Sequence, residues 1–174
     1  VVDKNRCAIS LIFSIFHAFG SGHVSEKYGL LFQNRGAGFT LEKNHPNELA
    51  GAKKPLHTII PAMVKKNGKL IMTYGVMGGQ YQPVGHVRIL SNLIDYKNDI
   101  QSSIDMPRSF ADSSGLILEN GYDDSVAVKL KELGHSIIRP EAPLGGAQAI
   151  LINQSDNVLI GASDGRKDGI AIGF

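Results

Sequence analysis

A short turn signal in the first half of the chain constrains the fold more than any other local feature. Asn67-Gly68 lies between two apolar stretches that together run from Pro61 to Gly75. Both residue types accept the positive φ angles of a tight type I′ turn, whose twist matches that of two paired strands. The segment from Pro61 to Gly75 is therefore predicted to form a β-hairpin.

Several other segments have the composition of strands. The run from Cys7 to Phe16 is rich in β-branched and aromatic residues and is too apolar for a half-exposed strand. A central strand buried on both faces is predicted there. Further strands are predicted at Tyr28 to Gln33, Gly115 to Leu118, Ala147 to Ile152 and Val158 to Gly161.

Two helices are predicted in the second half of the chain. The first starts near Pro83, because proline suits a first helical turn and apolar residues follow at helical spacing. The second runs from Asp124, as the N-cap, to Gly134, which suits a left-handed C-terminal stop. The expected buried face of the first helix consists of Val84, Val87, Leu90, Leu93 and Ile94. Strands early, helices in the middle and strands again at the end favour an α+β fold.

Length and charge limit the classes of function. The 174 residues, 43% of them hydrophobic, suffice for one core, so a single domain covering 1–174 is expected. The net charge of +2 is spread along the chain, which argues against nucleic acid as a partner. No apolar run reaches the roughly 20 residues of a membrane-spanning helix. The single cysteine, Cys7, cannot form an internal disulfide and favours a cytoplasmic over an exported location.

The sequence opens on Val1, directly in a strand-like pattern, so we expect that it was cut from a longer protein by processing or by excision. The polar stretch from Gly36 to Lys54 has neither helical nor strand periodicity. A long loop is predicted there, of the kind that often borders a functional site.

Few local patterns carry chemistry by themselves. Gly78-Gly79, between a strand and a helix, is either a plain tight turn or a pair of backbone N–H donors for an anion or oxyanion. A nucleotide-dependent transferase is disfavoured because no phosphate-loop lysine or acidic metal ligand lies nearby. The six histidines show no metal-ligand spacing, so no metal is expected. Asp164, Arg166, Lys167 and Asp168 form either a binding network or a solvated turn with ion pairs. The solvated turn is the more common case, although spacing alone does not decide between them.

Seven strings occur in a fixed order along the sequence: VVDK at 1–4, FGSG at 19–22, GLLFQNRGAGF at 29–39, KKPLHTIIPAM at 53–63, GVMGGQYQP at 75–83, GGAQAI at 145–150 and GASDGRKDG at 161–169. Taken together they resemble the small subunit of the gamma-glutamyltranspeptidase family, and the resemblance extends over nearly the whole chain.

The resemblance implies an αββα four-layer sandwich of the N-terminal-nucleophile hydrolase type. It also implies a zymogen that matures by autoproteolysis, with a threonine nucleophile directly upstream of Val1. The implied partners are a large subunit from the same precursor and a small gamma-glutamyl or related acyl substrate, with a higher oligomer left open. No cofactor is implied. The threonine attacks a gamma-glutamyl amide such as glutathione, and the acyl-enzyme passes to water or to an acceptor amine.

The resemblance also implies three catalytic residues in this chain. Ser14 aligns with a hydroxyl residue that orients the nucleophile, and its alternative role is a strand serine bonded to backbone. Gly78 and Gly79 align with the oxyanion-hole glycines of the family.

The expected substrate-binding positions depart from those of glutathione-cleaving members. His57 and Thr58 replace two serines that hold the α-carboxylate of the substrate. Arg35 and Gly38 replace an amide and an aspartate that binds the α-ammonium, and Phe16 replaces a polar residue. These departures resemble glutaryl-type acylases of the family, in which Arg35 can pair bidentately with a carboxylate.

Two alternatives to a gamma-glutamyl enzyme therefore stay open. One is a glutaryl-type acylase of the same family, and the other is a catalytically degenerate homologue that acts as a binding or structural protein. Gly165, where the family usually has proline, is expected to affect only the stiffness of its turn.

Overall fold

The computed structural model describes residues 1–174 and divides the chain into two compact units. The first unit contains Val1–Leu11 and Ile60–Phe174, and the second contains Ile12–Ile59. All the strands and α-helices belong to the first unit, whereas the second holds one short 3-10 helix, η1 (Arg35–Gly38). None of the helices is long and apolar enough to cross a membrane.

The predicted hairpin is confirmed. Strands β1 (Ala62–Lys66) and β2 (Lys69–Met77) pair antiparallel, and the register shifts between Val64 and Lys65. Asn67 and Gly68 have φ angles of 51° and 78°, as a type I′ turn requires. The local turn chemistry therefore predicted this part of the fold correctly.

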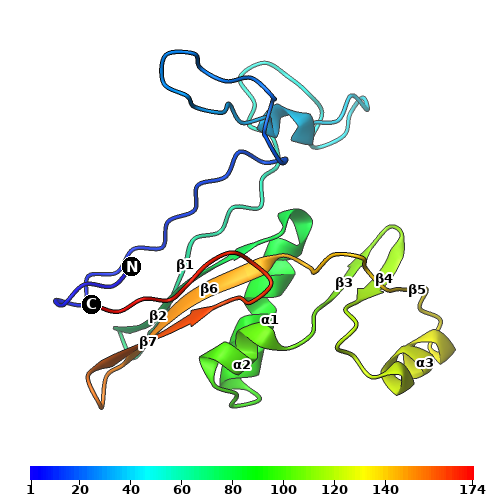
Figure 1. Ribbon diagram of the computed structural model, residues 1–174. Helices are drawn as coiled ribbons and strands as arrows, with labels where there is room; N and C mark the ends of the chain where they lie inside the picture. Colours follow the sequence, from blue (N-terminus) through cyan, green and yellow to red (C-terminus); the bar gives the residue numbers. More distant parts are fainter. The chain divides into compact units, whose positions relative to one another are not determined.

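Strands β6 (Gly146–Asn153) and β7 (Val158–Ser163) complete an antiparallel sheet in the order β1-β2-β6-β7. Helices α1 (Gln82–Ile94) and α2 (Ile100–Asp105) pack on one face of this sheet (Figure 1). The core between them combines every second residue of the strands with three helical isoleucines. Its fully buried members are Met72, Tyr74, Val76, Tyr81, Ile89, Ile100, Ile104, Ala147, Ala149 and Ala162.

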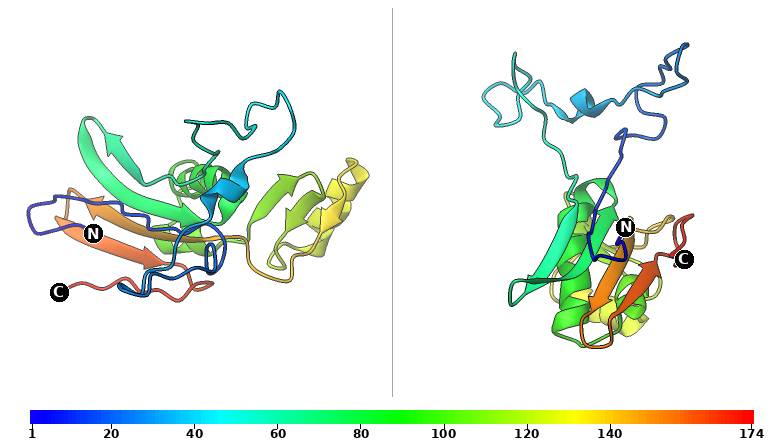
Figure 2. Two further views of the ribbon diagram at one scale, coloured as in Figure 1. Left: turned by 90° about the horizontal axis from the view of Figure 1, so that it is seen from above. Right: turned by 90° about the vertical axis from the view of Figure 1, so that its left-hand side faces the viewer.

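A second, smaller sheet lies beside the first rather than stacked on it (Figures 1 and 2). It consists of β3 (Ser109–Asp112), β4 (Gly115–Leu118) and β5 (Ile137–Ile138) in that order. Helix α3 (Asp124–Glu132) connects β4 to the parallel strand β5. Strands β4, β6 and β7 and helix α3 confirm four sequence predictions, although the N-cap is Asp123 and not Asp124. The α+β fold class is also confirmed.

The predicted buried face of α1 is correct only in part. Leu90 and Leu93 are half-buried and pack against the core, but Val84, Val87 and Ile94 are exposed. The fully buried residues of the helix are instead Gln82, Gly85, His86, Ile89 and Asn92. A Cβ at Gly85 would lie 2.7 Å from the Tyr81 ring and 2.8 Å from Val76, so the absence of a side chain lets the helix approach β2 closely. This close approach, which hydrophobic spacing does not reveal, decides which face is buried.

The predicted central strand from Cys7 to Phe16 is also wrong. Its backbone forms only an isolated bridge between Val2 and Ala8, and Leu11 and Phe13 are 83% and 92% exposed. A strand needs a neighbour that accepts its backbone hydrogen bonds, and no strand of this chain pairs with the run. The Ser10 hydroxyl nevertheless reaches the first sheet, where it donates to the Tyr74 carbonyl and accepts from the Ala62 N–H.

The second unit is mostly irregular. The predicted strand at Tyr28 to Gln33 is wrong, because only a single bridge from Val24 to Leu31 forms there. The predicted loop from Gly36 to Lys54 is confirmed, apart from the end of η1 and a bridge between Thr40 and Glu48. Turns and side-chain hydrogen bonds, rather than a sheet, hold this unit together.

Buried His86 predicts a pH-dependent stability. Its ring packs edge-on against Tyr74, with 4.7 Å between the centroids, and burial lowers the pKa of His86 while the Ile60 backbone offsets part of this effect. As the pH falls below about 6.5, the unfolded chain therefore binds a proton that the folded chain excludes, so the folded state loses stability. The loss is at most about 1.4 kcal/mol per pH unit.

We therefore expect His86→Leu to be less sensitive to acid than the unsubstituted protein. Chemical unfolding at pH 7.5 and pH 5.5, on the protein made from its full gene, measures the difference. Parallel pH dependence in the two proteins would show that His86 does not contribute in this way.

Candidate functional site

The pair Gly78-Gly79 directly follows β2, and Gly79 begins the helical segment that leads into α1. Gly79–Tyr81 form a 3-10 turn (η2), and the Tyr81 N–H donates to the Gly78 carbonyl at 3.1 Å. The φ angles of 132° at Gly78 and 58° at Gly79 are unfavourable for residues with side chains. Both glycines are exposed, so their backbone is accessible next to the start of a helix. This arrangement suits N–H donors for a developing oxyanion.

A second glycine pair packs against this turn. A Cβ at Gly78 would lie 2.7 Å from the Gly145 Cα, and a Cβ at Gly145 would lie 2.1 Å from the Met77 carbonyl oxygen. Gly146 pairs with Met77 at the start of β6. The backbone at Gly145 therefore lies against the exposed turn, at a distance that a side chain on either glycine would prevent.

In the second unit, Arg35 brings together two other predicted site residues. One guanidinium nitrogen, Nη2, donates to the Ser14 hydroxyl at 3.2 Å, and the Arg35 Cζ lies 5.1 Å from the centroid of the Phe16 ring. The same Ser14 hydroxyl accepts from the Phe16 N–H at 3.2 Å. Arg35 forms no ion pair, because the four salt bridges of the chain involve only Arg108, Arg139 and Arg166 as cations. The cluster therefore holds one half-buried positive charge without an anion.

Gly38 lies at the edge of this cluster. A Cβ at Gly38 would be 3.3 Å from the Leu56 carbonyl oxygen and 4.0 Å from the Phe16 ring, so little room remains for a side chain. Asn47 connects two loop segments there. Its Nδ2 donates to the Gly38 carbonyl, and its Oδ1 accepts from the Leu56 N–H at 3.0 Å. Asn47 is thus a positioning residue of this cluster that the sequence analysis missed.

Two predicted residues of the second unit remain. His57 and Thr58 directly follow Leu56; the His57 side chain is exposed and makes no hydrogen bond, and Thr58 is half-buried. The structure thus brings Ser14, Phe16, Arg35 and Gly38 together within the second unit. Gly78 and Gly79 belong to the first unit.

The prediction of a solvated turn at Asp164 to Asp168 is wrong at Asp164. The side chains of Arg108 and Asp164 are 3% and 0% exposed, and they form a buried ion pair. Arg166 bridges Asp164 and the nearly buried Glu119, with contacts of 3.3 and 3.1 Å. Arg108 and Glu119 lie far from Asp164 in the sequence, so no local pattern indicated this network.

Two effects compete at Asp164. Burial raises the pKa of the Asp164 carboxyl, but hydrogen bonds from Arg108 and the Arg166 backbone, together with the charges of both arginines, outweigh it. The net effect holds the pKa below its ordinary value of 3.8. Asp164 is therefore a permanent anion at neutral pH.

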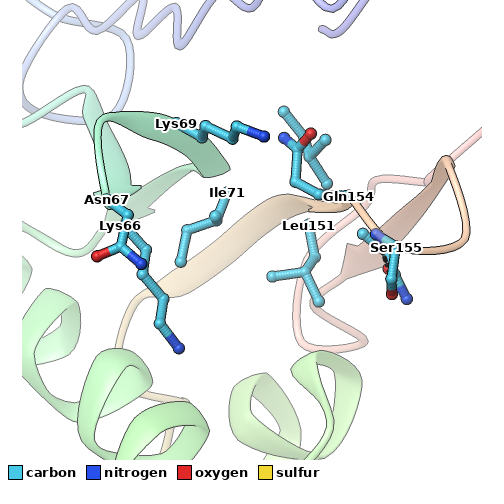
Figure 3. A pocket seen from close by; sticks show the side chains of 9 residues that line it. Lys66, Asn67, Lys69, Ile71, Leu151, Gln154 and Ser155 are labelled. Atoms are coloured by element: carbon cyan, nitrogen blue, oxygen red, sulfur yellow. Dashed lines mark hydrogen bonds between the residues drawn. The ribbon is translucent and has the colours of Figure 1, made fainter.

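Two cavities of the first unit are lined by residues other than Gly78 and Gly79. The larger, about 520 Å³, lies at the tips of the β1–β2 and β6–β7 hairpins, where Lys66 and Lys69 border a floor that includes Ile71 and Leu151 (Figure 3). The smaller, about 290 Å³, borders Glu119 and Arg166 of the buried network. No group of three or more His, Cys, Asp or Glu side chains is arranged to hold a metal ion.

Comparison with known proteins identifies similar chains. The sequence matches the gamma-glutamyltranspeptidase family over residues 1–174. It is 36% identical over 182 residues to the glutathione hydrolase-like YwrD proenzyme of Bacillus subtilis (strain 168), with 100% of this chain and 35% of that protein covered. It is 35% identical over 182 residues to the oxamate amidohydrolase proenzyme of Klebsiella pneumoniae, with 100% and 34% covered. The chain thus spans about a third of the length of these curated relatives.

A solved structure agrees with these matches. An acivicin-inhibited gamma-glutamyltranspeptidase contains a chain that superposes with a TM-score of 0.87 at 26% identity, and the alignment covers 97% of both chains. The core architecture is therefore that of a known fold.

The glycine turn predicts unequal effects of two adjacent substitutions. Gly79→Ala places its Cβ in open space and is expected to cost only the roughly 1–2 kcal/mol of a left-handed alanine. Gly78→Ala adds a steric overlap with the Gly145 backbone, so the total loss is expected to exceed about 3 kcal/mol. Chemical unfolding of both variants measures the difference. Equal losses would mean that Gly145 can move away without cost.

Proposed function

Because this chain belongs to the gamma-glutamyltranspeptidase family, we propose that it is the small-subunit part of an N-terminal-nucleophile amidohydrolase or acyltransferase. The observation that carries the proposal is the family match over residues 1–174, together with an accessible glycine turn where the oxyanion donors are expected. Both curated relatives are named proenzymes, and this chain corresponds to about a third of each. A larger precursor that matures by self-cleavage accounts for both observations.

The proposed reaction uses a threonine of the precursor that lies directly before the Val1 segment. Its hydroxyl oxygen attacks the carbonyl carbon of the substrate amide, and its α-amine takes the hydroxyl proton. The N–H groups of Gly78 and Gly79 stabilise the negative oxygen of the tetrahedral intermediate. The C–N bond then breaks, the leaving amine takes the proton, and an acyl-enzyme remains. Water or an acceptor amine attacks this ester, which releases the acid or a new amide and restores the threonine hydroxyl.

The proposed partner is the large subunit from the same precursor. Apolar side chains exposed in this chain support it: Phe13, Phe19 and Leu41 are 92%, 75% and 83% exposed, and large exposed apolar surfaces mark interaction sites. The unpaired run around Leu11 also needs a neighbouring strand for its backbone. A partner chain that covers these apolar side chains and pairs with this run would complete the layers of the sandwich.

Maturation is the first prediction of this proposal. Expression of the full gene should yield two chains, and the small one should begin with threonine shortly before Val1. Intact mass and N-terminal sequencing measure both properties. A single uncleaved chain, or a new N-terminus without a hydroxyl or thiol, would instead favour a degenerate homologue that acts as a binding or structural protein.

A specific observation favours a second candidate substrate over gamma-glutamyl amides, namely glutaryl-type amides. A gamma-glutamyl group carries an α-ammonium, which needs an anion, yet the cluster offers the unpaired cation Arg35 and a glycine with little room at position 38. Stacking on Phe16 and the bond to Ser14 orient the guanidinium while other N–H groups stay free for a carboxylate. The relative named oxamate amidohydrolase acts, by its name, on a substrate with a carboxylate and no ammonium.

Arg35 therefore predicts selectivity for an acyl group with a terminal carboxylate. The mature protein should hydrolyse a glutaryl anilide faster than the matching gamma-glutamyl anilide. Arg35→Gln should lower kcat/KM for the glutaryl anilide by about 10- to 100-fold, because a charge-assisted hydrogen bond is lost. The uncharged pentanoyl anilide should change by less than about twofold, since it makes no such bond.

A matched control is Lys27→Gln, which removes another cation that lies over an aromatic ring, Tyr28, in the same unit. It should leave both kcat/KM values unchanged. Faster turnover of the gamma-glutamyl anilide by the unsubstituted protein would return the assignment to gamma-glutamyl substrates such as glutathione.

A further inference from the structure

The backbone on both sides of Gly145-Gly146 is anchored by the buried ion network. The Leu144 N–H donates to Glu119 Oε1 at 2.8 Å, and the Leu144 carbonyl accepts from Arg108 Nη1 at 2.6 Å. Three residues later, the Ala147 N–H donates to Asp164 Oδ2 at 2.9 Å, and its carbonyl accepts from the Asp164 N–H at 3.1 Å. The N–H and carbonyl groups of both Leu144 and Ala147 are thus held by the charged residues, either by their side chains or by their backbone.

The anchored segment is the surface against which the Gly78 turn packs. Gly145, with a φ angle of 58°, lies between the two anchors and sits closer to Gly78 than any side chain would permit. A shift of Leu144 or Ala147 therefore moves the support of the turn directly. Protein interiors transmit such displacements because they are close-packed.

Arg108 reaches the same turn by a second route. Its guanidinium carbon lies 5.9 Å from the centroid of the Tyr81 ring, and Tyr81 is the last residue of η2. The Tyr81 ring is fully buried and lies next to both glycine positions: its Cδ1 would be 3.4 Å from a Cβ at Gly78 and 2.9 Å from one at Gly145. Two independent contacts thus connect one buried arginine to the turn.

We propose that Arg108, Glu119 and Asp164 are positioning residues, a clamp that holds the N–H groups of Gly78 and Gly79 in the geometry of an oxyanion hole. This inference rests on the proposed function, which assigns those two glycines as donors. None of the three charged side chains needs to contact the substrate. They act through Leu144, Gly145, Ala147 and Tyr81.

The clamp matters because oxyanion stabilisation depends on donors that are fixed before the reaction starts. The turn itself is exposed and contains two glycines, the residues with the greatest backbone freedom. Without a rigid support, the donors would sample many orientations, and each turnover would have to order them. A buried and fully paired network supplies that support, since its members have few alternative partners.

The test uses the protein made from its full gene and two matched acid-to-amide changes. Glu119→Gln keeps the shape of the side chain but removes its charge from the clamp. Asp124→Asn is the control, because it breaks the exposed pair between Asp124 and Arg139 on α3. The measurements are kcat and KM for the better of the two anilide substrates, and the affinity of an alkylboronic acid. A boronic acid forms a tetrahedral adduct with a hydroxyl nucleophile and so reports on the oxyanion site.

We expect Glu119→Gln to lower kcat by about tenfold or more, to change KM by less than about twofold, and to weaken boronate binding in parallel with kcat. A residue with a merely structural role would change the melting temperature without this pattern. The proposal is overturned if Glu119→Gln matures, folds and matches Asp124→Asn in kcat and boronate affinity.

Hydrogen exchange followed by mass spectrometry gives a second readout that needs no activity. In Glu119→Gln, exchange should accelerate at Leu144 and also at the Tyr81 N–H, which donates to Gly78. Faster exchange at Leu144 alone would overturn the clamp. If Glu119→Gln does not fold, Arg108→Lys replaces it in both measurements. This change keeps the positive charge but removes the planar guanidinium and its several N–H donors. Failure of the proposed function would appear differently, as absence of amidase activity in the unsubstituted protein.

Discussion

The buried ion pair between Arg108 and Asp164 joins parts of the first unit that are far apart in sequence. Arg108 directly precedes β3, Asp164 directly follows β7, and Glu119 follows β4, so the network ties the small sheet to the end of the large one. Charges this deeply buried are tolerated only when they are paired and hydrogen-bonded. Loss of one partner from such a pair typically costs about 3–5 kcal/mol, because the other charge stays buried without compensation.

The buried network is connected to the exposed glycine turn through the backbone of β6. The turn follows β2, whose last residue, Met77, pairs with Gly146, and the segment around Gly146 is held by the charged residues. The backbone contact between Gly78 and Gly145 leaves no space for adjustment by side chains. The turn is therefore exposed on one side and packed against anchored backbone on the other, which is the arrangement that the proposed oxyanion donors need.

The second unit is held together by different interactions from those of the first. It has no sheet, and side-chain hydrogen bonds connect its loops. Arg35 donates to the Ser14 hydroxyl, and Asn47 donates to the Gly38 carbonyl and accepts from the Leu56 N–H. A half-buried cation with no anion costs solvation energy unless a ligand or partner compensates for it. The proposed preference for an acyl group with a carboxylate rests on this unpaired cation.

The sequence by itself determined the elements whose causes are local. Asn67-Gly68 specifies a hairpin because of its φ angles, Gly134 ends a helix for the same reason, and β4 follows from a short apolar run. The ordered motifs also indicated the family before any geometry was known, since they depend on residue identity and not on packing. Ser14 and Arg35 could be singled out in this way, although no local pattern showed that their side chains would meet.

Tertiary structure alone decided the features that depend on contacts between distant residues. The run from Cys7 to Phe16 has strand composition but no partner in this chain, so composition could not make it a strand. The buried face of α1 depends on the close approach at Gly85, and the two-residue strand β5 depends on parallel pairing with β4, which lies before helix α3 in the sequence. Asp164 looked like a residue of a solvated turn because its partner Arg108 is 56 positions away. Electrostatic pairing acts through space, so only the folded chain reveals which charges are buried together.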